Sequence, residues 1–93
     1  MGYAYQARVR AAERIKDAVI VRFTYYGSRS MNIHEDTIYE GSSRYNEAVK
    51  IRPGDEVYAA PEENHKIYKI NINSWWKRLY VRAIVALERG RTL

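Results

Sequence analysis

Residues 19–26 alternate between two faces, and this alternation constrains the fold more than any other feature of the chain. A repeat of two residues is typical of a β-strand, whose successive side chains point to opposite sides. One face of the predicted strand carries Val19, Val21, Phe23 and Tyr25. Gly27 follows directly and marks a turn.

The return strand of this predicted hairpin continues the alternation at Met31 and Ile33. A two-residue loop of Gly27 and Ser28 would mix the faces of the two strands. A three-residue loop of residues 25–27 instead pairs Val21 with Met31 and Val19 with Ile33. It also places Gly27 at a left-handed position, where a missing Cβ is favourable. We therefore expect the three-residue loop.

A helix is predicted at each end of the chain. Near the N-terminus, apolar residues recur at spacings of three and four, which indicates one helical stripe ending near Asp17. These residues are Ala4, Ala7, Ala11, Ile15 and Ala18. The second helix is expected from Trp75 to Arg89, with Asn73 or Ser74 as its N-cap and Gly90 at its C-terminal left-handed position.

Short strands separated by turns fill the middle of the chain. The expected strands are Thr37–Glu40, Ala48–Ile51, Glu56–Ala60 and Lys66–Ile72, the last with Tyr68, Ile70 and Ile72 on one face. Pro53-Gly54 suits the central positions of a type II turn, and residues 61–64 are predicted to form another turn. The predicted fold class is α+β: a small antiparallel β-barrel or roll with an N-terminal and a C-terminal helix, in one domain spanning residues 1–93.

The composition excludes several classes of protein. The chain has no cysteine, so it has neither a disulfide framework nor a thiolate metal site, which fits a reducing, cytoplasmic location. Its longest apolar run, residues 83–87, is far shorter than the roughly 20 residues of a membrane helix. We expect no membrane association, no signal peptide, no metal and no cofactor.

The charge is unevenly distributed along the chain. The net charge is +5, and eleven of the sixteen basic residues are arginine, whose planar guanidinium suits phosphates and carboxylates. Residues 1–34 carry +4, residues 35–63 carry −5, and residues 64–93 carry +6. If the two ends pack on one side, the molecule would have a basic face and an acidic face.

Two stretches of the chain resemble a known family. The run from Ala11 to Gly27 resembles the opening helix and tyrosine-ended strand of the WYL domain, a small Sm/SH3-like barrel of prokaryotic regulators. Val57-Tyr58-Ala59 occupies the place of the Trp-Tyr-Leu motif and keeps its tyrosine, and residues 66–72 are similar to a later basic and aromatic strand. The resemblance covers about residues 11–73 and implies sensing of nucleic acids or nucleotides. The helix-turn-helix that often accompanies such domains has no room in this chain.

Basic residues interleaved with aromatic ones suggest binding of nucleic acid. Single strands are bound by positive grooves with aromatic side chains on which bases stack. The candidate binding residues are Arg22, Tyr25, Tyr26, Lys66, Tyr68, Lys69, Arg78, Arg82 and Arg89, the three arginines of the last helix forming one stripe. The predicted function is non-catalytic, regulatory binding of single-stranded RNA or DNA, or of a nucleotide, and a homo-oligomer is left open.

Two other classes of function remain as alternatives. A small metal-independent ribonuclease could use His34 and His65 with Glu35 and Asp36 as acid and base, but the spacing of these residues fixes no geometry. A protein-binding regulator or inhibitor encoded by a mobile element fits the many tyrosines and arginines, because these residues dominate interface hot spots. We assign no catalytic residue from the sequence.

Overall fold

The computed structural model of the protein describes residues 3–27, 32–73, 83, 84, 86 and 87. In these residues, five antiparallel strands form one sheet with the order β3-β2-β1-β4-β5. The strands are β1 (Tyr5–Ile15), β2 (Ala18–Tyr25), β3 (His34–Tyr39), β4 (Glu56–Ala60) and β5 (Lys66–Asn71). A short helix, α1 (Tyr45–Ala48), lies between β3 and β4, and a 3-10 turn, η1 (Pro61–Glu63), joins β4 to β5.

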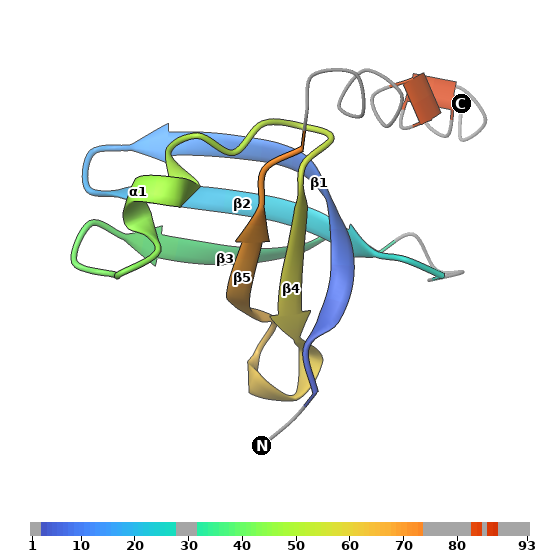
Figure 1. The fold of residues 1–93 in the computed structure, drawn as a ribbon, viewed down its shortest axis with the longest axis horizontal. Helices are drawn as coiled ribbons and strands as arrows, with labels where there is room; N and C mark the ends of the chain where they lie inside the picture. The colour runs from blue at the N-terminus through green and yellow to red at the C-terminus, as the bar shows by residue number, and fades with distance from the viewer. Residues whose placement is uncertain (1–2, 28–31, 74–82, 85, 88–93) are drawn as a thin grey trace.

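A bend in β1 curls the sheet into a half-barrel (Figure 1). The strand pairs with β2 over most of its length and with β4 over residues 5–8. Val9 pairs with Phe23, and the next pair is Ala11 with Arg22. Arg10 therefore has no counterpart in β2 and is the extra residue of a β-bulge. Bulges bend a strand and increase its twist, which lets one strand belong to both halves of the curled sheet.

The core fills the concave side of this half-barrel. Residues directly opposite in an antiparallel pair face the same side, so Val9 and Phe23 both point inward and are fully buried. The other large, fully buried apolar side chains are Val19, Val21, Val57 and Ile67. The helix α1 adds Ala48, which is buried against the same core.

The structure confirms the small antiparallel roll and several of its predicted elements. β2 has the predicted inward face, and β4 has the predicted bounds. The N–H of Asp55 donates to the carbonyl of Arg52 at 3.0 Å, and Gly54 has a φ of 100°, as a type II turn around Pro53-Gly54 requires.

The predicted N-terminal helix is wrong, because residues 5–15 are strand β1. Ala7 and Val9 face inward as alternation requires, but the bulge then shifts the pattern, so that Ala12 packs against the core. Of the residues in the predicted stripe, Ala7 and Ala18 are buried, whereas Ala4 and Ile15 are exposed. The spacings of three and four therefore do not correspond to one buried face.

The predicted hairpin loop after β2 is also wrong. Val21 pairs with Asp36 and Val19 with Ile38, so the partners lie further along the chain than Met31 and Ile33. Ile38 is buried whereas Ile33 is 59% exposed, and the core therefore selects the later register. Gly27 does have the expected positive φ, at 75°.

Two predictions in the second half of the chain need correction. Residues 48–51 do not form the predicted strand. Helix α1 ends at Ala48, and a turn follows in which the N–H of Ile51 donates to the carbonyl of Ala48 at 3.1 Å. In β5, Lys69 pairs with Tyr58 and Ile67 with Ala59, so Tyr68 is the extra residue of a second bulge. Ile67 and Ile70 therefore face the core while Tyr68 and Ile72 are exposed.

The predicted C-terminal helix from Trp75 to Arg89 lies outside the described residues except for Ala83, Ile84, Ala86 and Leu87, which are helical. Within the described part of the chain, no helix is long and apolar enough to cross a membrane.

Candidate functional site

The two outer strands of the sheet, β3 and β5, meet because the sheet curls. The backbone N–H of Ile67 donates to Oδ2 of Asp36 at 2.9 Å, which joins the two strands across the opening of the half-barrel. The rings of His34 and His65 stack 3.9 Å apart at an angle of 19°. Residues far apart in the sequence therefore share one seam.

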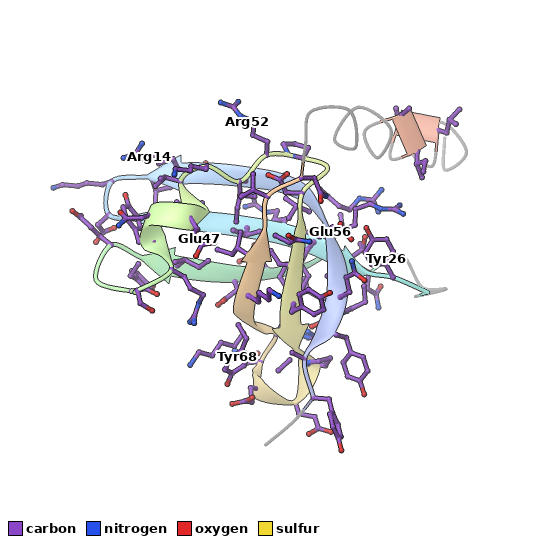
Figure 2. All side chains as sticks on the ribbon, in the orientation of Figure 1. Arg14, Tyr26, Glu47, Arg52, Glu56 and Tyr68 are labelled. Atoms are coloured by element: carbon purple, nitrogen blue, oxygen red, sulfur yellow. The ribbon has the colours of Figure 1, made fainter. Side chains whose placement is uncertain are left out.

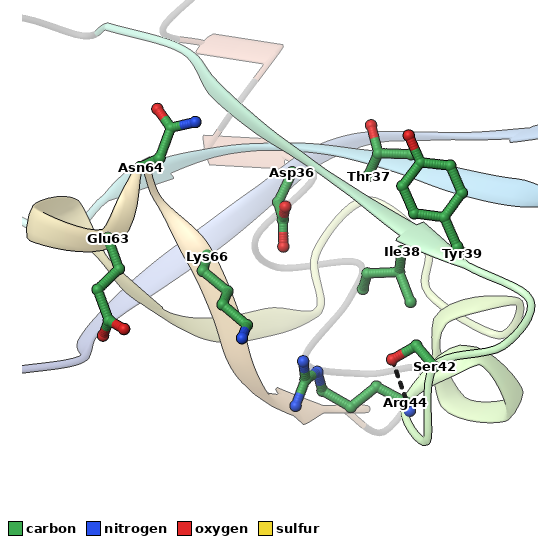
Figure 3. A pocket seen from close by; sticks show the side chains of 9 residues that line it. All are labelled: Asp36, Thr37, Ile38, Tyr39, Ser42, Arg44, Glu63, Asn64 and Lys66. Carbon is green, nitrogen blue, oxygen red and sulfur yellow. Dashed lines mark hydrogen bonds between the residues drawn. The ribbon is translucent and has the colours of Figure 1, made fainter.

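A cleft of about 280 Å³ lies along this seam, and we call it the β3–β5 cleft (Figure 3). Its walls come from β3, from the turn that follows it, and from the segment between η1 and β5. The lining residues are Asp36, Thr37, Ile38, Tyr39, Ser42, Arg44, Glu63, Asn64 and Lys66.

Arg44 and Lys66 supply the positive charge of the β3–β5 cleft. The backbone N–H of Arg44 donates to Oγ of Ser42 at 3.2 Å, which fixes the turn that carries it. The Nε atom of Arg44 is buried and has no hydrogen-bond acceptor among the described residues. Buried donors are nearly always satisfied by protein, water or an ion, so this guanidinium has unused hydrogen-bonding capacity.

An aromatic ring stands beside these two cations. Tyr68, labelled in Figure 2, is 40% exposed on β5. The guanidinium of Arg44 lies 6.0 Å and the ammonium of Lys66 5.2 Å from its ring centre. Its hydroxyl donates to Glu63 at 2.6 Å, and this hydrogen bond is the main cause that raises the pKa of Tyr68. Tyr39, 61% exposed, adds a second ring to the cleft.

The stacked histidines line a second, more open cleft of about 580 Å³, which we call the histidine cleft. It shares Asp36, Thr37, Tyr39 and Asn64 with the β3–β5 cleft, so the two are continuous. The remaining lining residues are Ile33, His34, Glu35 and His65.

Tyr25 holds one member of the histidine pair. Its hydroxyl lies 3.0 Å from Nδ1 of His65, and burial raises the pKa of Tyr25 to about 12. Burial, followed by the charge of His65, lowers the pKa of His34 below its ordinary value of 6.5. His65 and the preceding Asn64 both have left-handed backbones, with φ values of 62° and 60°. Such conformations are unfavourable for residues with side chains and concentrate at functional sites.

Three predicted binding residues lie away from the clefts. Arg22 is on the outward face of β2, 3.4 Å from carboxylates of both Glu13 and Glu35. The hydroxyl of Tyr26 donates to Glu56 at 2.9 Å (Figure 2), and Lys69 lies 5.6 Å from the ring centre of Tyr58.

The structure therefore separates the residues that the sequence grouped together. Lys66 lines the β3–β5 cleft, Tyr68 lies beside Lys66 and Arg44, and Tyr25 contacts His65. Arg78, Arg82 and Arg89 lie outside the described residues. Sequence reasoning missed Arg44 and Tyr39, because nothing in their local pattern distinguishes them from solvated residues. It considered His34 and His65 but had no means of bringing them together.

Metal binding finds no support in this geometry. Among the described residues, no three His, Asp or Glu side chains are grouped closely enough to hold a metal ion. Comparisons of the chain with protein-family models, with curated proteins and with solved structures found no match.

Proposed function

We propose that the protein binds single-stranded nucleic acid, or a nucleotide, in the β3–β5 cleft. The observation that carries this proposal is the group of Arg44, Lys66 and the exposed ring of Tyr68 at one opening. The buried Nε of Arg44 lacks an acceptor among the described residues, as expected of a guanidinium whose ligand is an anion. Phosphate oxygens would accept from Arg44 and Lys66, and a base would stack on an exposed tyrosine.

The expected affinity is moderate. A base stacked on an aromatic side chain contributes about 1–3 kcal/mol, and two cations neutralise about two phosphates. Asp36 and Glu63 also line the cleft and lower its positive potential. Specificity for a particular base is therefore expected to be weak.

Fold-level analogy supports the same class of ligand. Small, partly open five-stranded barrels include folds that bind oligonucleotides on an open sheet face and its neighbouring loops. The WYL-like relationship, the Sm/SH3-like barrel and a regulatory role stay predictions from the sequence.

The test is the salt dependence of oligonucleotide binding. We expect the affinity for a fluorescent single-stranded oligonucleotide to fall with a log–log slope of about −1.4, since each neutralised phosphate contributes about −0.7 on single strands. Arg44→Gln and Lys66→Gln should each weaken binding several-fold and make the slope shallower by about 0.7. Fluorescence anisotropy over about 50–200 mM salt measures both quantities.

A matched control is available outside the two clefts. Lys50 is an exposed cation that follows α1 and does not line either cleft, so Lys50→Gln should change binding little. If Arg44→Gln, Lys66→Gln and Lys50→Gln weaken binding equally, the oligonucleotide is attracted by the net charge of the protein. The assignment of the β3–β5 cleft as the binding site is then wrong. If the wild-type protein binds neither oligonucleotides nor nucleotides, the proposed function fails.

A protein partner is the second candidate. Several large side chains are more than half exposed, and tyrosine is enriched at the energetic centres of interfaces. They are Tyr3, Tyr5, Ile33, Tyr39 and Leu87. Co-purification of one stoichiometric protein that survives nuclease treatment and is lost in Tyr39→Ala would favour this candidate.

A further inference from the structure

The histidine pair has a geometry that binding alone does not use. Two imidazoles stack at 3.9 Å, one of them is held by a tyrosine hydroxyl, and both line a cleft continuous with the β3–β5 cleft. An acid–base pair requires two titratable groups near one bound bond, with a third group that orients one of them. These three side chains satisfy that requirement.

We propose that His34 and His65 cleave single-stranded RNA bound across the two clefts, acting as general base and general acid in a transesterification. This inference rests on the proposed function, because the RNA is held by the groups of the β3–β5 cleft. It goes beyond that function by assigning a reaction to residues that do not take part in binding the phosphates.

The surroundings of the two rings assign their roles. His34 is the base, because burial and the neighbouring imidazole favour its neutral form. His65 is the acid, because its Nδ1–H can donate to the hydroxyl oxygen of Tyr25, which stays a neutral phenol at neutral pH. Stacked imidazoles repel when both are charged, which adds to the effect of burial in favouring the neutral form of His34.

The reaction balances without water or an added reagent. His34 takes the proton of a ribose 2′-hydroxyl, and the oxygen attacks the adjacent phosphorus to form a new O–P bond. The bond from phosphorus to the 5′-oxygen of the next nucleotide breaks, and its electron pair goes to that oxygen, which takes the proton of His65. The products are a 2′,3′-cyclic phosphate and a free 5′-hydroxyl. Proton exchange with solvent then restores the pair.

The neighbouring charges are compatible with this chemistry. Lys66 follows His65 directly and places a cation beside the position of the phosphate. The nearby carboxylates have other partners: Glu35 lies 3.4 Å from Arg22, Asp36 accepts from the N–H of Ile67, and Glu63 accepts from Tyr68. The contact between the Tyr25 hydroxyl and Nδ1 of His65 restrains the direction of the His65 ring, which a general acid needs.

The test compares a short oligoribonucleotide with the all-deoxy oligonucleotide of the same sequence. We expect the wild-type protein to bind both and to cleave only the ribonucleotide, with a 2′,3′-cyclic phosphate on the product identified by mass spectrometry. Addition of a chelator should not stop the reaction, because imidazoles make both proton transfers. His34→Gln and His65→Gln should each lower the cleavage rate by at least about 100-fold while binding of the deoxy oligonucleotide persists. Lys50→Gln should cleave normally.

The pH profile separates a catalytic pair from a structural one. The rate should be bell-shaped, because the base must be neutral and the acid protonated. Tyr25→Phe removes the hydrogen bond that orients His65, so it should lower the cleavage rate while binding of the deoxy oligonucleotide persists. This readout also decides the matter if a glutamine variant does not fold.

The outcomes distinguish this inference from the proposed function. Binding without cleavage at any pH overturns the inference and leaves the proposed function intact. Cleavage that persists in both glutamine variants also overturns it, because the activity then belongs to other groups. Absence of binding to either oligonucleotide overturns both.

Discussion

The hydrogen bond between Asp36 and Ile67 closes the half-barrel, and Asp36→Ala is the change that tests its importance. Ile67 is fully buried, and its N–H donates to Oδ2 of Asp36 at 2.9 Å. The alanine variant leaves this donor without its acceptor. Asp36→Asn keeps an oxygen at the same position and is the conservative partner of the experiment.

The expected cost follows from the burial of the donor. A buried N–H that loses its partner costs about 1–3 kcal/mol, and a hydrogen bond to a charged acceptor contributes about 1.5–3 kcal/mol. We therefore expect Asp36→Ala to destabilise the protein by about 2 kcal/mol. For a domain of about this size, that corresponds to a fall in melting temperature of roughly 8–16 °C. Asp36→Asn should cost less than about 1 kcal/mol.

Thermal melting by circular dichroism and hydrogen exchange of the Ile67 amide measure the effect together. Glu35→Ala is the matched control, since Glu35 neighbours Asp36 and its ion pair with Arg22 is exposed to solvent. Suppose that Asp36→Ala has the same melting temperature as the control and that the Ile67 amide stays protected from hydrogen exchange. Other contacts then hold β3 and β5 together, and the reasoning is refuted.

Three further predictions concern the core, a turn and the response to alkali. Phe23→Ala should cost about 3–5 kcal/mol in urea denaturation, because the ring is fully buried and leaves a cavity, and a small loss would show that the core can collapse around it. Gly54→Ala should lower the free energy of unfolding by about 1–3 kcal/mol, because φ is 100° at this position. Gly41→Ala should melt like the wild type, because a Cβ added there meets no neighbouring atom. The pKa of Tyr25 is raised from 10.0 to about 12, so its contribution to stability is complete below pH 10.0 and is lost as the pH rises towards 12. Urea denaturation below and above this range should show that the free energy of unfolding falls with pH, and that it falls less in Tyr25→Phe than in the wild type. An equal fall in both proteins would contradict the assignment.

The elements that were predicted correctly are those in which local chemistry and tertiary packing agree. The inward face of β2 is continuous from Val19 to Phe23, so alternation alone identifies it. Pro53 and Gly54 have few options besides a tight turn, and the strand Glu56–Ala60 begins directly after it. Each of these features is determined by its nearest neighbours in the sequence.

The elements that were predicted wrongly involve a bulge or a distant partner. Arg10 and Tyr68 each add a residue to a strand, and a search for strict alternation cannot anticipate them. The register of β3 depends on which isoleucine the core accepts, Ile33 or Ile38, and only the packed sheet decides. Short apolar spacings are therefore weak evidence for a helix when alanine supplies most of them.

The candidate site was the least predictable part of the molecule for the same reason. Lys66 and Tyr68 stood out because they are neighbours in a basic and aromatic strand. Arg44 reaches them from the turn before α1, and His34 meets His65 only after the sheet has curled. A cleft between two outer strands has no signature in the sequence of either strand.

The shared strand β1 also determines the order in which the protein can fold. β1, β2 and β3 are consecutive in the chain and form neighbouring antiparallel pairs, whose short connections close with little loss of entropy. β4 must find β1 over a much longer loop, as the contact between Gln6 and Glu56, 50 positions apart, illustrates. Contacts between residues so distant in sequence slow folding, so the hairpin of β4 and β5 is expected to dock late. His34 arrives with the first unit and His65 with the second, and the stacked histidines exist only when folding is complete.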